Sequence, residues 1–170
     1  MALFWAASAV MPTTAAPATV TPTPTTVNTL LQIATPSTST LKVVAFGIEF
    51  ANALTAAATV ELVDTAAIAC TGMNAHVAAG VQPYGADAQG GTSIMTLGTG
   101  ATGWWKTGQT EGTITSVRTA KTKILPISAV SYEWEWSLGR EFLVPVSHFL
   151  RIRVTTSVNV GTYAWILWDE

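Results

Sequence analysis

Apolar and polar side chains alternate most clearly in two stretches, VSYEWEWS at residues 130–137 and HFLRIRVTT at residues 148–156. In the first, Glu133 and Glu135 fall on the face of an extended chain opposite the aromatic residues. In the second, Arg151 and Arg153 oppose a row of aliphatic residues. A period of two residues is that of a β-strand, so both stretches are predicted strands. We expect their glutamate and arginine rows to pair across a ladder.

Shorter runs of the same kind occur along the rest of the chain from Thr29. They are TLLQIAT (29–35), LKVVAFGIEF (41–50), TVELVDT (59–65), AIACT (67–71), AHVAA (75–79), GTITSVRTA (112–120), KTKILPI (121–127), REFLVP (140–145) and TYAWILW (162–168). Turn-prone residues separate them, no long helical stripe competes, and only residues 51–58 favour a helical turn. This pattern predicts an all-β protein, an antiparallel β-sandwich of jelly-roll-like form.

The first forty residues are free of charge and rich in proline and threonine, which predicts an extended N-terminal arm at residues 1–40 before a sandwich domain at residues 41–170. The apolar side chains of the arm favour docking over a disordered linker: they are Leu3, Phe4, Trp5 and Met11. Removal of residues 1–26 should then leave the sandwich folded. No basic residue precedes Lys42, so we expect this segment to be retained and not cleaved as a signal peptide.

A glycine-rich excursion is predicted at about residues 80–108, and long loops of this kind often carry binding sites. It contains the adjacent pair Trp104 and Trp105, which could offer a sugar-binding platform. Adjacent residues on a strand point to opposite faces, however, which weakens that interpretation. The strand tryptophans Trp134, Trp136, Trp165 and Trp168 are predicted to lie in the core or at a subunit interface.

Composition excludes several classes of partner. Of 170 residues, 49% are apolar and 11% are charged, and Lys plus Arg (8) nearly balance Asp plus Glu (10). No basic run occurs, so nucleic acid is not expected as a partner. Prolines and threonines interrupt the apolar stretches before they reach the roughly 18 residues of a transmembrane helix, so no membrane span is expected. The charges before residue 86 are Lys42, Glu49, Glu61 and Asp64, and we expect protein neighbours to cover this charge-poor half.

No motif for chemistry is evident, and we predict no catalytic residue, cofactor or metal. Cys70 is the single cysteine and is expected to be a small buried residue. His76 and His148 have no ligand spacing around them and are expected at ordinary strand positions. Glu133 and Glu135 are spaced acceptably for a sandwich glycosidase, but they face away from the aromatic residues of their own strand. Catalysis is therefore the weakest alternative.

The run WSLGREFLVPVSHFLRIRVTTSVNV at residues 136–160, followed by TYAWILWDE at residues 162–170, resembles small structural proteins of tailed bacteriophages, the capsid decoration or minor capsid class. The resemblance covers mainly residues 41–50 and 110–170, and its most specific segments are LGRE and FLRIRVT. Many proteins of this class are jelly-roll sandwiches that assemble as trimers. A charge-poor sandwich suits a subunit whose surface is covered by neighbours.

The resemblance implies a virion protein on the capsid surface, made in the host cytoplasm, with the major capsid protein and its own copies in a homotrimer as partners. The candidate interface residues are Leu3, Phe4, Trp5, Met11, Trp104, Trp105, Arg140, Glu141, Arg151 and Arg153. The four charged residues are expected in inter-strand or inter-subunit ion pairs, or on a solvated sheet face. A carbohydrate- or receptor-binding module remains the main alternative function.

Overall fold

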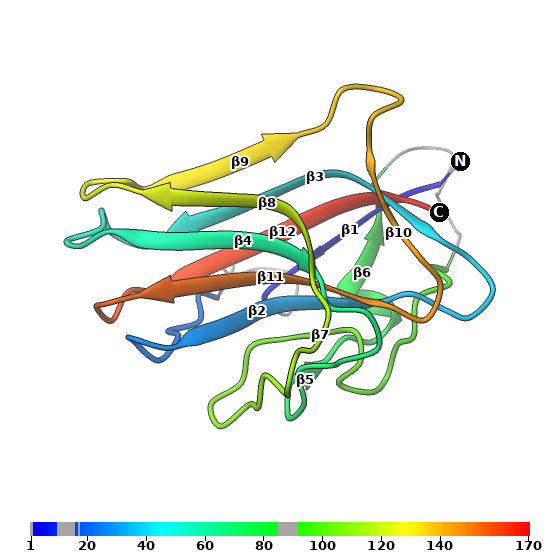
Figure 1. Ribbon diagram of the computed structural model, residues 1–170, viewed down its shortest axis with the longest axis horizontal. Helices are drawn as coiled ribbons and strands as arrows, with labels where there is room; N and C mark the ends of the chain where they lie inside the picture. Colours follow the sequence, from blue (N-terminus) through cyan, green and yellow to red (C-terminus); the bar gives the residue numbers. More distant parts are fainter. Residues whose placement is uncertain (1, 10–15, 17, 85–91) are drawn as a thin grey trace.

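The computed structural model describes residues 2–9, 16, 18–84 and 92–170. They form two antiparallel sheets that face one another, which confirms the predicted sandwich (Figure 1). Sheet A runs in spatial order through β10 (Phe142–Val144), β3 (Leu41–Phe50), β12 (Thr162–Asp169), β1 (Leu3–Ala7) and β6 (Val81–Pro83), with β9 (Ser131–Glu135) also paired to β3. Sheet B runs through β5 (Asn74–Ala75), β7 (Gly103–Trp104), β2 (Val27–Ala34), β11 (Phe149–Thr156), β4 (Ala58–Asp64) and β8 (Arg118–Leu125).

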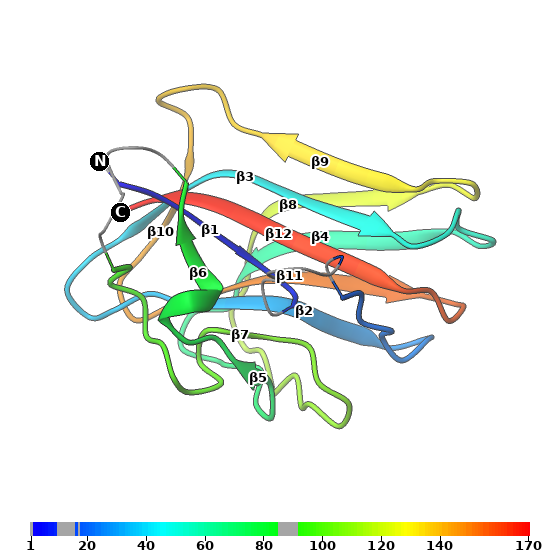
Figure 2. The same ribbon diagram turned by 180° about the vertical axis from the view of Figure 1, so that it is seen from behind.

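The chain crosses between the sheets at most of its connections, so each sheet combines strands that are far apart in the sequence. In sheet A the two ends of the chain meet, because β1 pairs with β12 from Leu3 opposite Asp169 to Ala7 opposite Trp165 (Figure 2). In sheet B, β11 lies between β2 and β4. Neither sheet is complete without residues from the first forty.

The prediction of an extended arm at residues 1–40 is therefore wrong for the two segments that form β1 and β2. β1 lies between β12 and β6, and β2 lies between β7 and β11. Phe4 and Ala6 enter the core, and the ring of Phe4 stacks on that of Trp168 with 6.2 Å between centroids. The alternation in LFWAA is that of a strand in a sheet, and the described prolines Pro22 and Pro24 lie in the connection that leads to β2. Met11 lies outside the described residues.

The core between the sheets follows the alternation read from the sequence. On β11 the buried row is Leu150, Ile152 and Val154, and on β12 it is Ala164, Ile166 and Trp168. Their neighbours along each strand point to the outer faces of the sandwich. The two outer faces differ: loops cover part of sheet B, whereas sheet A carries an open groove.

Several predicted elements differ from those observed. The runs at 67–71 and 75–79 form turns, the edge of the short β5 and the 3₁₀ turn η1 (Ala78–Gly80) in place of full strands. Residues 112–120 and 121–127 contribute one strand, β8, and residues 51–58 form bends and no helix. The described part of the chain has no helix with the length and hydropathy of a membrane span.

The excursion predicted at residues 80–108 connects the two sheets. It begins with β6 in sheet A and reaches β7 in sheet B, and residues 85–91 lie outside the described part. With the loops around β5, the part of the excursion from residue 92 onward occupies the lower part of Figure 1, beside β2. Its apolar residues therefore serve partly to cover sheet B.

The opposite edge of the sandwich is formed by β8 and β9, one from each sheet. The Nζ atom of Lys121 on β8 lies 3.2 Å from the ring centroid of Trp134 on β9, a cation–π contact between the sheets. Trp136 packs against Phe46 and Phe142 at ring distances of 6.0 and 6.4 Å. Aromatic residues thus close this edge of the core.

Candidate functional site

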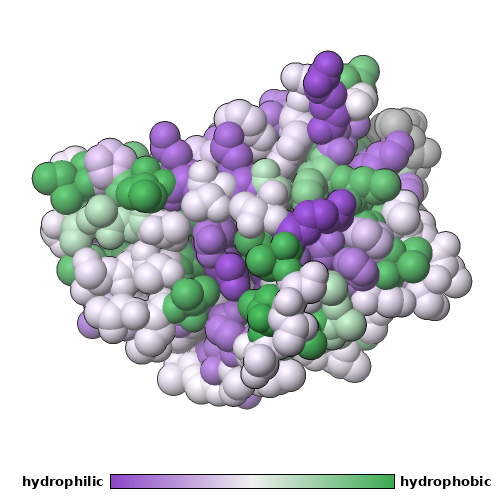
Figure 3. Space-filling model, viewed as in Figure 1, coloured by the Kyte–Doolittle hydropathy of each residue, from purple (hydrophilic) through white to green (hydrophobic). Residues whose placement is uncertain are grey.

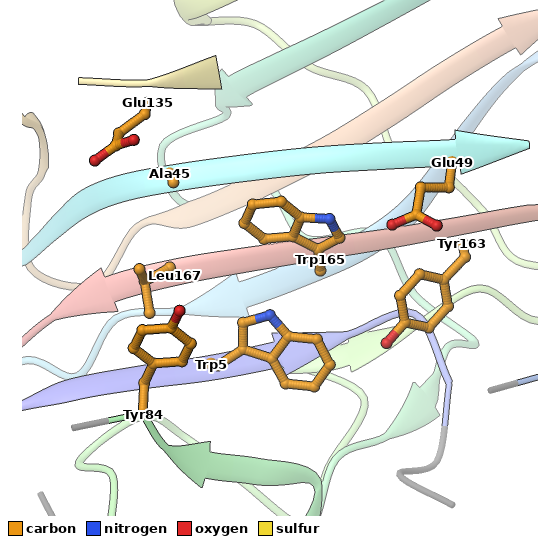
Figure 4. A pocket seen from close by; sticks show the side chains of 8 residues that line it. All are labelled: Trp5, Ala45, Glu49, Tyr84, Glu135, Tyr163, Trp165 and Leu167. Carbon is orange, nitrogen blue, oxygen red and sulfur yellow. The ribbon is translucent and has the colours of Figure 1, made fainter. Parts of the chain in front are cut away.

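A groove lies on the face of sheet A that is turned away from the core (Figure 4). We call it the aromatic groove and define it by Trp5, Ala45, Glu49, Tyr84, Glu135, Tyr163, Trp165 and Leu167. β1, β3, β9 and β12 supply seven of these side chains, and the eighth, Tyr84, directly follows β6. Its volume of about 480 Å³ is within the range of small-molecule sites, about 300–1,000 Å³.

Trp165 lies flat on the sheet because the residue beside it on β3 is Gly47. The two are partners in the β12–β3 ladder. A Cβ atom at position 47 would lie only 2.5 Å from Cε2 and Nε1 of the indole, closer than any real side-chain contact. The missing side chain lets the ring cover the backbone of β3 and turn its other face toward the groove.

Trp5 lies beside Trp165 on the neighbouring strand. Its ladder partner is Leu167, two residues beyond Trp165, so the two tryptophans are diagonal neighbours. Diagonal pairs are within reach of aromatic side chains. Figure 4 shows the two indoles side by side and nearly broadside, with Tyr163 and Tyr84 on either side. Together they form a flat, largely apolar platform.

Carboxylates flank this platform at both ends. Glu49 is opposite Tyr163 in the ladder, and Glu135 is opposite Ala45 at the other end of the groove. Burial, and secondly the negative charge of Glu49, raise the pKa of the Tyr163 hydroxyl. Among the described residues that line the groove there is no lysine or arginine. The groove therefore offers apolar ring surface and hydrogen-bond acceptors with negative charge.

The expected pairing of the β9 glutamates with the arginines of β11 is wrong, because β9 and β11 belong to different sheets. Glu133 and Glu135 project from the outer face of sheet A, and Glu135 faces the groove that contains Trp165. Arg153 instead pairs with its neighbour on β4, with 2.9 Å between Nη2 and Oε2 of Glu61. Strand period assigned the faces correctly, but it does not reveal which strands are neighbours.

Arg151 is fully buried beneath the loops that cover sheet B. Its Nη1 donates to Oε2 of Glu111 at 3.2 Å, and its Nη2 donates to the carbonyl of Ile68. Glu111 also accepts from the backbone N–H and the hydroxyl of Thr29, at 2.6 and 2.7 Å. Burial, reinforced by Glu111, raises the pKa of the nearby Cys70 thiol to about 11. The cluster holds the loops against β2 and β11, and both terminal nitrogens of the Arg151 guanidinium have partners within the chain.

Trp104 and Trp105 are not brought together as a platform. The ring of Trp104 packs against His76, with 4.7 Å between centroids. The indole N–H of Trp105 donates to Oδ1 of Asn28 at 3.4 Å. Both are half-buried and contribute to the packing of the excursion on sheet B.

The other interface candidates are scattered over the fold. Leu3 is half-buried on the outer side of β1, and Phe4 is a core residue. Arg140 is exposed in the turn between β9 and β10 and forms no ion pair with any residue in the described ranges. Glu141 accepts from the backbone N–H of Gly139 at 2.8 Å, and hydrogen bonding to backbone N–H groups lowers its pKa.

Neither histidine occupies the expected strand position. His76 follows β5 and is buried, with Nε2 2.9 Å from the carbonyl oxygen of Ala7, and burial lowers its pKa to about 4. His148 precedes β11, with Nδ1 2.9 Å from Oδ1 of the buried Asp64, which also pairs with Arg118. Within the part of the chain that the structure describes, no three His, Cys, Asp or Glu side chains gather as a metal site would require.

No family model matches this chain, and none of the curated proteins or solved structures matches it. The aromatic groove is therefore interpreted from its own residues and geometry.

The sequence carried two signals for this groove. In TYAWILW the alternation puts Tyr163, Trp165 and Leu167 on one face, although Trp165 was expected only in the core or at an interface. An isolated glycine within a strand, here Gly47, often marks the close approach of another group. What the sequence did not indicate is that β1 lies beside β12, which brings Trp5 next to Trp165.

Proposed function

We propose that this chain is a structural virion protein that binds the outside of a tailed-phage capsid and decorates or stabilises it as a homotrimer, without catalysis. The resemblance of residues 41–50 and 110–170 to that class supports the proposal. The strand order also supports it, since β1-β12-β3-β9 opposes β2-β11-β4-β8, as expected for the jelly-roll-like form of many such proteins.

The observation that carries the proposal is an exposed apolar tip at the turn between β8 and β9. We define the apolar tip by Ile124, Ile127 and Val130, whose exposed fractions are 69%, 64% and 55%. No charged residue lies between Lys123 and Glu133. Figure 3 shows hydrophobic surface at the left end of the molecule, where Figure 1 places this turn. Clustered exposed aliphatic side chains are typical of a surface that another protein covers.

The chemistry of the apolar tip favours a protein partner with an apolar recess. Burying the exposed part of each of these side chains would contribute about 1–2 kcal/mol. The absence of charge from the tip avoids a desolvation cost. The major capsid protein is the partner we propose for it, and the homotrimer follows from the resemblance alone.

Co-sedimentation with purified capsids tests the attachment. The double variant Ile124→Asp, Ile127→Asp introduces two charges into the tip and should weaken capsid binding at least about tenfold. Val77→Asp is the matched control, because Val77 is also an exposed aliphatic residue but lies in the loop after β5. Circular dichroism should show both variants folded. If the wild type does not sediment with capsids, or the double variant binds as the wild type does, the attachment is wrong.

The oligomeric state is measured separately by size-exclusion chromatography with light scattering. Three copies per particle are expected, and a monomer at the concentration of the capsid assay would remove the trimer from the proposal.

A further inference from the structure

The aromatic groove on sheet A has no role in attachment through the apolar tip, since the two lie on different parts of the sandwich. The tip is a turn at the β8–β9 edge, whereas the groove is centred on β12 and β1. We propose that the aromatic groove is a carbohydrate-binding site that takes a neutral oligosaccharide, with sugar rings stacked on Trp165 and Trp5.

The shape of the platform is the first argument. The two indoles are displayed nearly broadside and side by side (Figure 4), and the Gly47 backbone supports the Trp165 ring from below. A pyranose ring has an apolar face of C–H groups, whose partial positive charge suits the negative face of an aromatic ring. Two adjacent indoles can therefore take consecutive sugar rings of one chain.

The polar groups around the platform are the second argument. Once the apolar faces of the sugar rings are covered, the sugar hydroxyls need hydrogen-bond partners at the rim of the groove. Glu49 and Glu135 supply acceptors at opposite ends of the groove, and the hydroxyls of Tyr84 and Tyr163 can donate or accept. The aromatic centre and polar rim thus match both surfaces of a sugar.

Charge decides which carbohydrates fit. Glu49 and Glu135 line the groove, Glu133 lies on the same outer face of β9, and no basic side chain is among the described lining residues. Sialylated, sulfated or uronic-acid chains would therefore be repelled. A second copy of this face would also bring carboxylates together. A lone ammonium group is best held by aromatic rings on several sides, whereas these indoles form an open platform. A neutral oligosaccharide is the ligand that both charge and shape favour.

The groove binds its ligand without cleaving it through these two carboxylates. Glu135 is opposite Ala45, and Glu49 is four residues further along β3, which corresponds to about 13 Å along an extended strand. Paired carboxyl groups in glycosidases are about 5–9.5 Å apart. We therefore expect affinity without hydrolysis.

Isothermal titration calorimetry on the full chain tests the site, with short oligomers of glucose, mannose and N-acetylglucosamine as neutral probes and with sialyllactose, sulfated dextran fragments and oligolysine as charged ones. At least one neutral oligomer should bind and the anionic ones should not. Trp165→Ala and Trp5→Ala should each weaken binding about tenfold or more. Trp105→Ala is the matched control, because Trp105 is a half-buried tryptophan outside the groove, and it should bind as the wild type does.

Several outcomes would overturn the site. They are the absence of binding to any neutral oligomer, binding that Trp165→Ala leaves unchanged, or tighter binding of oligolysine than of any sugar. Dissociation of an oligomer by Trp165→Ala in light scattering would show that the groove is instead buried between copies. Thermal unfolding of each variant separates loss of binding from loss of folding. The Trp165→Ala variant should still bind capsids, and the apolar-tip variant should still bind sugar. Failure of this proposal is therefore distinguishable from failure of the attachment proposal.

Discussion

At the scale of single residues, the contact between Gly47 and Trp165 leads to a sharp prediction. Gly47→Ala should lower the free energy of unfolding by about 1–3 kcal/mol, because the new methyl group would overlap the Trp165 indole and force it to move. In the Trp165→Ala background the same substitution should be neutral or slightly stabilising, since the backbone at position 47 is not in the left-handed region. Urea unfolding of the four proteins in this cycle measures the coupling.

The control is Gly47→Ala in the Trp165→Ala background. If Gly47→Ala costs as much without the indole as with it, the ring does not cover the glycine. The platform geometry would then be incorrect.

A second residue-scale prediction concerns pH. His76 has a pKa of about 4 in the folded protein and an ordinary value of 6.5 when unfolded, so the unfolded chain binds the proton more tightly. The stability that neutral His76 provides is therefore complete above pH 6.5 and decreases as the pH falls toward 4, by about 3 kcal/mol in all. Below pH 4 the loss levels off.

Other groups also titrate in this range, and burial raises the pKa of Glu170, an effect of opposite sign. His76→Gln isolates the histidine, because it retains an N–H donor toward the Ala7 carbonyl and does not ionise. Subtracting its stability–pH profile from that of the wild type should leave a slope between pH 4 and 6.5. A difference that is flat over this range would contradict a buried, neutral His76.

At the scale of elements, alternation predicted the strands and their faces well where one face is apolar. β11 and β12 have the buried rows that their sequences indicate. The need to bury one apolar face is enough to decide which side chains of such a strand point inward. The runs at 67–71 and 75–79 lie mostly in turns and loops beside β5, where Cys70 and His76 are buried but Val77, Ala78 and Ala79 are exposed. A short apolar run is compatible with both arrangements, so the sequence did not distinguish them.

Pairing between elements was harder to predict than the elements themselves. Arg151 and Arg153 were correctly placed on one face, but their partners, Glu111 and Glu61, come from segments distant in the sequence. The aromatic groove was missed for the same reason, since Trp5 and Trp165 come from opposite ends of the chain. Periodicity within a segment contains no information on which strand lies beside it.

At the scale of the whole molecule, both sheets depend on both ends of the sequence. β1 lies beside β12 in sheet A, and β2 lies beside β11 in sheet B. The predicted domain boundary at residue 41 therefore cuts through the sandwich. Strands of the charge-poor first half pair with strands of the second half in both sheets, which accounts for part of the covering that its composition predicts.

Nested truncation of the full chain tests this dependence. A fragment of residues 41–170 loses the core side chains Phe4, Leu30, Leu31 and Ile33. Burial of each of these side chains contributes about 2 kcal/mol to the free energy of unfolding. Their sum is comparable to the whole stability of a domain, about 5–15 kcal/mol, so this fragment should be unfolded. A fragment of residues 27–170 keeps β2 and loses Phe4 with the β1 ladder, so it should be destabilised but retain strand structure. Far-UV circular dichroism and amide NMR dispersion, with the full chain as reference, measure both. A cooperatively folded 41–170 fragment would instead restore the first forty residues as a separate arm.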